Sequence, residues 1–486
     1  MPKLVLLWTD VSIWLLAVAL VGYMLYARRQ VNLASTWRKV FGDAAALASS
    51  VVLAACLVLT LADSVHFRSV LPPAAGAPAG SVAYDARVQS LLDVALRDLV
   101  DSRESTYSRP LAYTGFTKES IEVDGKLERV APRLLHGGAH LTDPATQWRG
   151  DVAWRIVVGL VQGTIAAAIV CALFIAVLAQ RAGRSWRTMA AAVRHGETDI
   201  SWRVAALTLG ALFAIGGVIA SLMGYYHPFG TDVTGNDVLY QTLKSIRTAF
   251  VIGTLATIAT LPFAVVLGIM AGYMKGWVDE AIQYVYTLLA SIPNILLIAA
   301  CVLMVQVFLD KHQDLFETGV ERADVKLFLL CAVLGVTGWT GLCRLLRAET
   351  LKLRELEYVQ ASNAFGVSRS RIMVRHIFPN VAHLMLIVTV LEFSALILYE
   401  AVLSYVGVGV DPSMNSFGGM INFARNEMSR DPVVWWPFAA AFTFMVALVL
   451  AANLFADGVR DAFDPRSRAF RPRVIAKKLD EEAARA

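Results

Sequence analysis

The most constraining feature of this sequence is a series of apolar runs about 20 residues long, separated by more polar connections. A helix of that length crosses the ~30 Å hydrocarbon core of a bilayer. In lipid, each backbone N–H and C=O must be bonded within its own segment, so the runs predict helices rather than strands. With 57% hydrophobic and 17% charged residues over 486 positions, the composition excludes an ordinary soluble protein.

Nine runs qualify as membrane spans, so we expect an all-α polytopic membrane protein. They are Leu4–Tyr26, Ala44–Ala62, Val152–Ala179, Val204–Met223, Ala249–Met270, Tyr284–Phe308, Lys326–Leu342, Val381–Leu403 and Val433–Phe455. The first run differs from a signal peptide because its apolar core is long and its positive charges follow that core. We therefore expect it to be retained as an anchor.

Basic residues fall on alternate connections, which orients the chain because short basic loops remain cytoplasmic. The connections after the first and third spans, the 344–380 loop and the C-terminal tail are basic. The 344–380 loop has seven Lys or Arg against three acids, whereas the 310–325 connection has five acids against two bases. The pattern predicts an N-terminus outside the cell and a cytoplasmic C-terminus.

An outside segment, residues 63–151, separates the second and third spans. It opens with a Pro- and Gly-rich stretch typical of a loop, followed by a helical pattern over residues 88–102. We interpret it as a small cap. A role in recognition and a role as a structural spacer are both open.

The 344–380 connection contains an amphipathic, basic elbow. A short helix is expected over Glu355–Phe365, ended by Gly366 because glycine adopts left-handed geometry easily. Ser368 is placed to cap a second helix, Arg369–Phe378, and Pro379 suits the first turn of the next span. One face of the first helix carries Tyr358, Ala361, Ala364 and Phe365. By composition alone the elbow could equally lie on lipid headgroups.

A family resemblance decides between these readings. The stretch resembles the "EAA" loop of ABC-importer permeases, a Glu-Ala-Ala triplet before a glycine and a distal proline. Gln360, Ala361 and Ser362 take the triplet positions, Gly366 the glycine and Pro379 the proline. The resemblance implies docking into a groove of a cytoplasmic ATPase subunit. Glutamine in place of glutamate puts in doubt any ion pair made there, and Ser362 replaces an alanine.

Further segments resemble the dipeptide and oligopeptide branch of that family, including nickel carriers, in its C-type subunit. They keep their order from about Val204 to Arg466. These segments are His227–Leu239, Ala271–Glu280, Gly338–Val359, RHIFPN at Arg375–Asn380, Leu403–Pro412 and Asn453–Arg466.

The resemblance implies a type I importer core formed by the last six spans. The resulting division is 1–62 (two spans), 63–151 (outside segment), 152–203 (third span and basic loop), 204–466 (permease core with coupling loop 344–380) and 467–486 (cytoplasmic tail). No task follows from the resemblance for the first 203 residues.

The expected partners are a second permease subunit, two P-loop ATPase subunits, an extracytoplasmic solute-binding protein and the lipid bilayer, with no nucleic acid. The chain has no G-x-x-x-x-G-K-[ST] motif, so ATP would bind to the partner subunits. No hydrolase motif, metal-binding cysteine pair or histidine cluster is visible either, so we expect a non-catalytic subunit without cofactors or metals.

Two groups of site residues follow. The coupling group consists of Gln360, Ala361, Ser362, Ala364, Phe365, Gly366, Arg369, Arg371 and Pro379. The pore or gate group consists of Glu392, Glu400, Trp339 and Asn294. Ionisable residues within spans usually face a cavity or a partner, which singles out Glu392, with helix pairing as the alternative. For Trp339 and Asn294 we favour a packing role over lining of the transport pathway.

The branch implies short peptides as the solute, with nickel or another peptide-like solute carried by the same machinery as the alternative. A secondary transporter is the rival from another class. It should show internal repeats and interrupted, ion-coordinating helices, and no convincing repeat is present.

Overall fold

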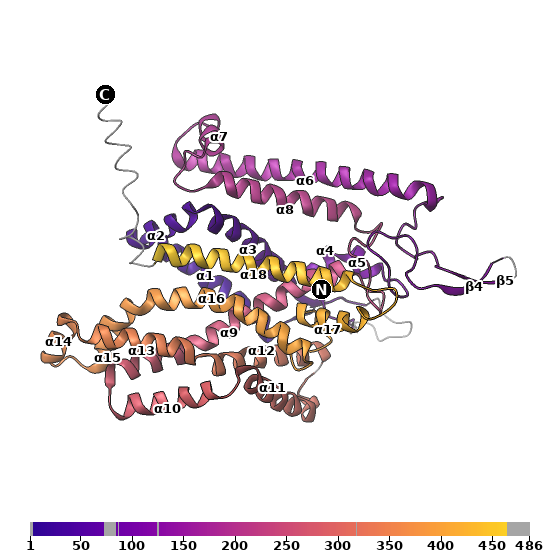
Figure 1. Cartoon of the computed structure of the whole chain (residues 1–486). Coiled ribbons are helices and arrows are strands. Elements are labelled where there is room, and N and C mark those ends of the chain that lie inside the picture. Colours follow the sequence, from indigo (N-terminus) through magenta and orange to yellow (C-terminus); the bar gives the residue numbers. More distant parts are fainter. Residues whose placement is uncertain (1–2, 72–83, 86, 124–125, 317, 464–486) are drawn as a thin grey trace, which may run out of the picture.

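The computed structural model describes all residues except 1–2, 72–83, 86, 124–125, 317 and 464–486. Helices dominate it (Figure 1). They are α1 (Trp8–Arg29), α2 (Val31–Gly42), α3 (Ala44–Asp63), α4 (Leu91–Ala95), α5 (Arg97–Asp101), α6 (Pro144–Ala182), α7 (Trp186–His195), α8 (Trp202–Leu222), α9 (Val238–Met274), α10 (Trp277–Ser291), α11 (Asn294–Lys311), α12 (Gly319–Gly338), α13 (Thr340–Arg354), α14 (Glu357–Ala364), α15 (Arg369–Ile372), α16 (Phe378–Tyr405), α17 (Phe417–Glu427) and α18 (Trp436–Phe463).

The strands are short. β1 (Lys3–Val5), β2 (His66–Arg68) and β3 (Gln89–Ser90) form one antiparallel sheet, and β4 (Glu119–Val123) pairs with β5 (Lys126–Val130). A 3₁₀ turn (Gln313–Leu315) follows α11, and a π-helical turn (Met373–Ile377) joins α15 to α16.

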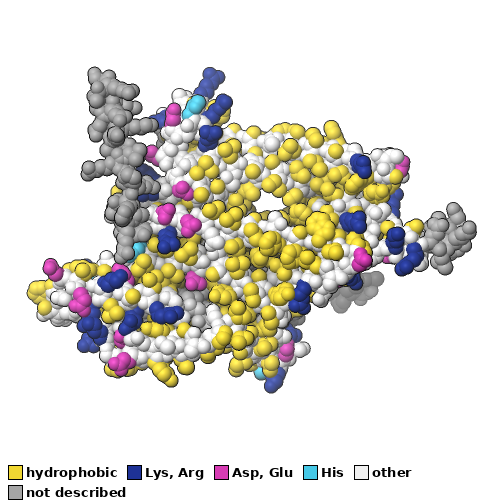
Figure 2. Space-filling view, viewed as in Figure 1, with side chains coloured by type: hydrophobic (Ala, Val, Ile, Leu, Met, Phe, Trp, Pro, Cys, Tyr) yellow, Lys and Arg dark blue, Asp and Glu magenta, His cyan; other side chains and the backbone are white. Residues whose placement is uncertain are grey.

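Nine helical paths within the described residues are long and apolar enough to cross a membrane, and they correspond one to one with the nine predicted spans. Figure 2 shows hydrophobic side chains covering the middle of the molecule, while most charged side chains lie toward its two ends. The predicted all-α polytopic architecture is confirmed.

Two predicted spans differ in detail. The run Tyr284–Phe308 was expected as one helix, but α10 ends at Ser291 and α11 starts at Asn294. The break falls at Pro293, which lacks an N–H and holds Ile292 in an extended conformation. The run ending at Leu342 continues as α13 to Arg354, so the predicted loop begins with several helical turns.

Helix α9 lies at the centre of the later spans and packs against α12, α13, α16 and α3. Its approach to α13 is close because Gly268 and Gly272 carry no side chain. A Cβ on Gly272 would lie 2.6 Å from the Cβ of Thr350. Helices α1 and α3 also contact this group, so the first spans are packed together with the later ones.

Helices α6 and α8 form a separate antiparallel pair along one side of the molecule (Figure 1). A Cβ on Gly159 or Gly163 of α6 would meet the backbone of α8 within 2.5 Å, and Gly217 of α8 makes the reciprocal close contact. The span expected as the first of the core, α8, therefore packs mainly on α6 and contacts α3.

The predicted helix over residues 88–102 is present as two short helices, α4 and α5, which meet at Leu96. Ser90 begins α4 with a reciprocal capping bond to Asp93. Leu92, Leu96 and Leu99 are buried against the start of α9. Most of the Pro- and Gly-rich stretch before this region, and the tail 467–486, lie outside the described residues.

Candidate functional site

The elbow begins with α14, and Gly366 ends it as predicted. Gly366 has φ +72°, in the left-handed region that favours glycine. The Gly366 N–H donates to Asn363 O at 3.0 Å, and the Val367 N–H donates to Ser362 O at 3.1 Å. These bonds satisfy carbonyls at the end of the helix and fix the direction in which the chain leaves it.

The second half of the elbow differs from the prediction. Ser368 occupies the N-cap position, but its side chain makes no capping bond. The separate helix Arg369–Phe378 is instead the short α15, which passes through the π-helical turn directly into α16. Pro379 lies in the first turn of α16, as predicted, where its missing N–H costs nothing. The elbow is therefore continuous with a span.

The inner face of the elbow is fixed to the ends of α9 and α13. Val359, Ile372 and Ile377 are fully buried in a cluster that includes Leu346. The Tyr273 hydroxyl donates to Asn363 Oδ1 at 2.7 Å. Close packing and this bond hold the elbow against its supporting helices.

The outer face of the elbow is apolar and open. Phe365 at its tip is 86% exposed, Val374 is 68% exposed and Tyr358 is 43% exposed. The structure also leaves most of the predicted coupling group exposed on the elbow: Gln360, Ala361, Ala364, Gly366, Arg369, Arg371 and Pro379. Ser362 is half-buried, with its hydroxyl bonded to Tyr358 O at 2.8 Å. We define the surface of Tyr358, Ala361, Ala364, Phe365 and Gly366 as the elbow face.

The glutamine that replaces the usual glutamate has a local partner. Gln360 Nε2 donates to Glu355 O at 3.2 Å and lies 3.5 Å from Glu355 Oε2. The Glu355 carboxylate is also 3.4 Å from Lys275 Nζ. A glutamate at 360 would place a second carboxylate beside Glu355, so the neutral amide avoids repulsion here.

A second brace joins α13 to the start of α10. Arg347 donates from Nε and Nη2 to the two carboxylate oxygens of Asp279, at 2.6 and 2.8 Å. These bonds lower the pKa of Asp279. Paired geometry of this kind is directional, so α10 and α13 are held in one orientation next to the elbow.

The predicted pore residues do not form one site. Glu392 is half-buried, and it makes no hydrogen bond or ion pair with the residues that the structure describes. Glu400 is 1% exposed and accepts hydrogen bonds from the Ser404 hydroxyl at 2.7 Å, from Ser416 and from the Gly418 backbone. It joins α16 to α17, which makes an open gate at this position a poor fit.

The other two pore candidates lie elsewhere. Trp339 is 5% exposed in the cluster between α9 and α13, where it has a packing role in this chain. Asn294 is exposed at the first residue of α11, directly after the Pro293 break. Its amide lies where two half-helices meet within a bent span.

A buried histidine between two carboxylates marks the opposite end of the molecule. His227 Nδ1 is 2.8 Å from Asp237 Oδ2, and Nε2 is 3.4 Å from Glu104 Oε1. Burial opposes the charged ring, but the two carboxylates raise the pKa of His227 to about 9. Glu104 belongs to the 63–151 segment, which the basic loops predict to lie outside, and the other two residues belong to the stretch before α9. We call this the outer latch.

Backbone donors complete the outer latch. Glu104 accepts from the N–H groups of Leu135, His136 and Gly137 at 2.8 to 3.0 Å. Burial opposes ionisation, yet these bonds and the contact with His227 hold the pKa of Glu104 at about 2. The sequence does not show that His227 and Glu104 meet, because they are 123 positions apart.

A buried ion-pair network lies nearby, and the sequence interpretation missed it. Asp10 of α1 is 3% exposed, and its Oδ1 lies 2.6 Å from Arg247 Nη2 of α9. His66 Nδ1 is 2.7 Å from the other oxygen of Asp10. Asp324 of α12 is bonded by Thr9 and lies 3.8 Å from Arg247.

The network continues toward the outside segment. Lys244 Nζ lies 2.9 Å from Asp63 and 2.8 Å from Asp93. Three parts of the chain, α1, α3 and α4, are thus joined to α9 by charge. Asp10 was the signal in the sequence, because it lies inside the predicted span Leu4–Tyr26 and ionisable residues within spans generally pair with a partner. No group of three or more metal-ligating side chains occurs in the described part of the chain.

The chain can now be compared with known proteins. Residues 264–469 match the family described as "Binding-protein-dependent transport system inner membrane component". The oligopeptide transport system permease protein OppC of Mycobacterium tuberculosis is 33% identical over 51% of this chain and 79% of its own length. The chain belongs to this permease family.

Other relatives of the permease agree. OppC of Haemophilus influenzae is 31% identical over 51% of this chain and 73% of its own length. The dipeptide transport system permease protein DppC of Lactococcus lactis is 30% identical over 49% of this chain and 64% of its own length. A solved MetNI methionine ABC transporter matches with 16% identity and a TM-score of 0.33, too low to add to the argument.

Family membership gives the permease its general activity. It is the non-catalytic membrane component of a binding-protein-dependent ABC transporter, a multi-pass inner membrane protein without cofactors of its own. ATPase and binding-protein partners are implied. The secondary-transporter alternative is thereby removed.

Proposed function

We propose that this permease forms half of a pore for short peptides and that its elbow couples the pore to an ATPase. The relatives named as oligopeptide and dipeptide permeases support the peptide assignment. Nickel or another peptide-like solute carried by the same machinery is the alternative. A peptide pore recognises little of its cargo, so selectivity would come from the binding protein.

One observation supports the coupling role above the others. Phe365, a large apolar side chain at the tip of the elbow, is 86% exposed beyond the ends of the supporting helices. Buried aromatic anchors dominate the binding energy of protein interfaces. The elbow face would insert into a groove of the ATPase, with Arg369 and Arg371 at the periphery.

The elbow is suited to transmit force because it is continuous with two spans. It leaves α13 through a turn of two residues and enters α16 through the π-helical turn without a break. When ATP closes the ATPase dimer, displacement of the elbow would tilt α13 and α16 as rigid bodies. The pore would alternate between outward-open and inward-open states.

The assembly we propose contains a second permease subunit, two ATPase subunits and an extracytoplasmic binding protein. The N-terminus lies outside and the elbow in the cytoplasm, following the distribution of basic loops. Residues 204–466 form the permease core, and residues 1–203 form an extension. Glu392 and Asn294 are proposed to face the pore or the second subunit, because neither has a partner among the described residues.

Gly366→Leu tests the coupling role. Leucine strains the left-handed position by about 1–2 kcal/mol and redirects Phe365. We expect normal membrane levels, retained ATP hydrolysis by the purified assembly, and loss of ATP-dependent uptake of a labelled tripeptide. Gly22→Leu, at a helical glycine of α1 with open space around it, is the matched control. Normal uptake by Gly366→Leu would refute coupling through the elbow.

A further inference from the structure

The α6–α8 pair leaves an apolar chamber where it meets α3. A cavity of about 320 Å³ is lined by side chains from α2, α3, α6, α7 and α8. Phe41, Val51, Phe174, Trp202 and Ala206 supply much of its wall. The volume lies within the ~300–1,000 Å³ range of ligand pockets.

The walls contain almost no polar groups. Of the lining residues, Ser50 is the one with a hydroxyl, and that hydroxyl bonds to Leu47 O within its own helix at 2.7 Å. The rings of Phe174 and Trp202 meet edge to face with centroids 4.9 Å apart. An apolar chamber of this kind fits a hydrocarbon chain, because its walls offer few partners to a polar ligand beyond the indole N–H of Trp202 and the thiol of Cys171.

The connections beside the chamber are basic, and we call their Lys and Arg residues the rim. Ser201 donates from its backbone N–H to Phe41 O at 3.3 Å and from its hydroxyl to Gly42 O at 2.7 Å. This seam brings together two basic connections that are far apart in the sequence. Residues 38–43 and 181–203 of these connections together carry seven Lys or Arg (Arg38, Lys39, Arg181, Arg184, Arg187, Arg194 and Arg203) and three acids (Asp43, Glu197 and Asp199).

Three of these arginines are close in sequence to residues that line the chamber. Arg181 follows Leu178 by three positions on α6, and Arg194 and Arg203 directly follow Val193 and Trp202. In Figure 2 the dark-blue side chains gather at the end of the molecule where α7 lies. The arginines at 181, 184, 187, 194 and 203 are all exposed.

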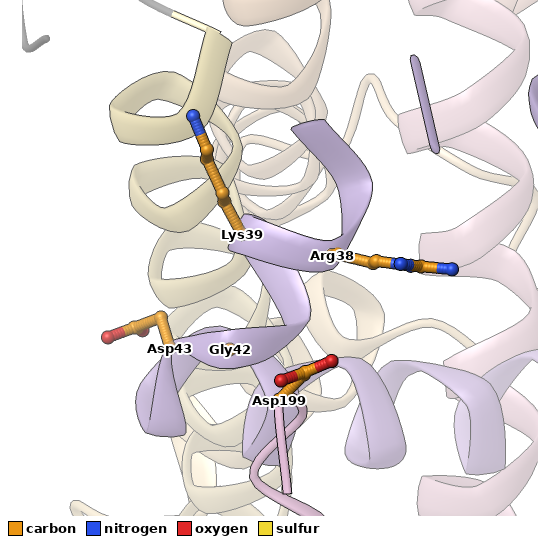
Figure 3. Close-up of a pocket in the computed structure, with 5 residues that line it drawn as sticks. All are labelled: Arg38, Lys39, Gly42, Asp43 and Asp199. Atoms are coloured by element: carbon orange, nitrogen blue, oxygen red, sulfur yellow. The ribbon is translucent and has the colours of Figure 1, made fainter. Parts of the chain in front are cut away.

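Across the seam is a more open polar pocket of about 460 Å³, lined by Arg38, Lys39, Gly42, Asp43 and Asp199. Figure 3 shows that its four charged side chains point in different directions. They do not converge on one ligand, so we assign no separate site there. Arg38 and Lys39 instead extend the basic rim.

We propose that the chamber holds an acyl chain of an anionic phospholipid of the surrounding bilayer, whose phosphate contacts the arginine rim. Basic pockets between membrane helices bind anionic headgroups. Each Lys or Arg near the membrane surface adds to the electrostatic attraction for anionic lipids. The apolar chamber matches the acyl chain of the lipid. The basic rim matches the negative charge of its phosphate. The lipid would fill the space between the α6–α8 pair and α3, where protein packing is incomplete.

Lipid retention by the purified full chain tests this proposal. The protein is reconstituted in equimolar phosphatidylglycerol and phosphatidylcholine with identical chains, transferred to detergent, and its retained lipids are counted by native mass spectrometry. We expect preferential retention of phosphatidylglycerol. Ala206→Phe, which fills the chamber, should abolish that retention, whereas Ala211→Phe on the exposed side of α8 should preserve it.

A second set of variants tests the rim without touching the packing. The pair Arg184→Gln and Arg194→Gln should lower the preference for phosphatidylglycerol by roughly fivefold per arginine. Arg28→Gln with Arg29→Gln, at the end of α1, serves as the control and should leave it unchanged. Equal retention of both lipids by the wild type would overturn the proposal. The proposal would also be overturned if a cysteine introduced by Leu209→Cys, in the wall of the chamber, formed a cross-link to another polypeptide.

Discussion

The two ends of this permease differ in which side chains they expose and which they bury. At the elbow, large apolar side chains such as Phe365 stand exposed, and the ion pair of Lys275 and Glu355 lies on the surface. At the other end, Arg247 and His227 are buried and matched by carboxylates within the same chain. The elbow thus exposes apolar side chains, whereas at the other end buried charged side chains are paired with carboxylates of the same chain.

The difference indicates where partners bind and where the chain holds itself together. An exposed apolar patch at the tip of a rigid element indicates an interaction site. Buried, paired charges contribute little net stability but are costly to break, so they specify one arrangement of the parts they join. Here they join the N-terminal extension to α9. Four predictions test this contrast, in order of decreasing effect.

The largest effect is expected from Arg247→Met. It leaves Asp10 and Asp324 buried without their cation, which costs about 3–5 kcal/mol. We expect a large fall in the thermal unfolding temperature of the purified chain. The triple variant with Asp10→Asn and Asp324→Asn removes all three charges and should recover much of that loss. An unchanged unfolding temperature in the single variant would contradict a role of this ion-pair network in stabilising the fold.

The outer latch predicts a dependence of stability on pH. His227 has a pKa of about 9 when folded and 6.5 ordinarily, so its contribution is complete below pH 6.5 and lost as the pH rises through 9. The shift corresponds to at most about 3 kcal/mol. Glu104 acts in the opposite direction, since its contribution is present above pH 4.5 and lost as the pH falls through about 2.

Thermal unfolding between pH 6 and pH 10 measures the histidine contribution. Wild type should lose stability across this range, and His227→Gln should be less stable at pH 6 with a flatter profile. Gln241→Ala, which alters a more exposed side chain on the first turn of α9, is the control for local disturbance. Parallel profiles for wild type and His227→Gln would contradict a charged latch.

At the elbow, Phe365→Ser should leave folding intact and weaken ATPase binding. The side chain contributes no core packing, so the unfolding temperature should not change. An interface anchor is worth about 2 kcal/mol, or roughly thirtyfold in affinity. Phe423→Ser, 61% exposed at the opposite end, is the matched control in a pull-down of the ATPase. Equal loss in both variants would remove the distinction between the two ends.

The smallest effect is expected from Gln360→Glu, which restores the usual family residue. The new carboxylate lies near Glu355 on an exposed surface, so repulsion should cost no more than about 0.5 kcal/mol. A measurable gain in ATPase binding would show that the partner offers a cation at this position. Gln313→Glu, on the 3₁₀ turn after α11, tests whether any added carboxylate has the same effect.

Local patterns predicted much of the elbow and of the spans. Gly366 as a helix stop and Pro379 in the first turn of α16 are both confirmed, because each depends on the conformational limits of one residue. The capping role of Ser368 is wrong, since its side chain makes no bond to the first turn of α15, and the predicted helix Arg369–Phe378 instead runs through a π-helical turn into α16. The break at Pro293 was not predicted, because the apolar run Tyr284–Phe308 is long enough to cross a bilayer as one helix.

The sequence by itself determined that this chain crosses a membrane, where its spans lie, and which short stretch resembles the family's coupling loop. Those features follow from run length and from residue-specific backbone limits, which act over a few neighbouring positions. Tertiary structure alone decided that Asp10 meets Arg247 and Glu104 meets His227, and that two basic connections share one chamber. Such contacts join residues more than a hundred positions apart. Nothing local in a single sequence indicates which distant residues meet.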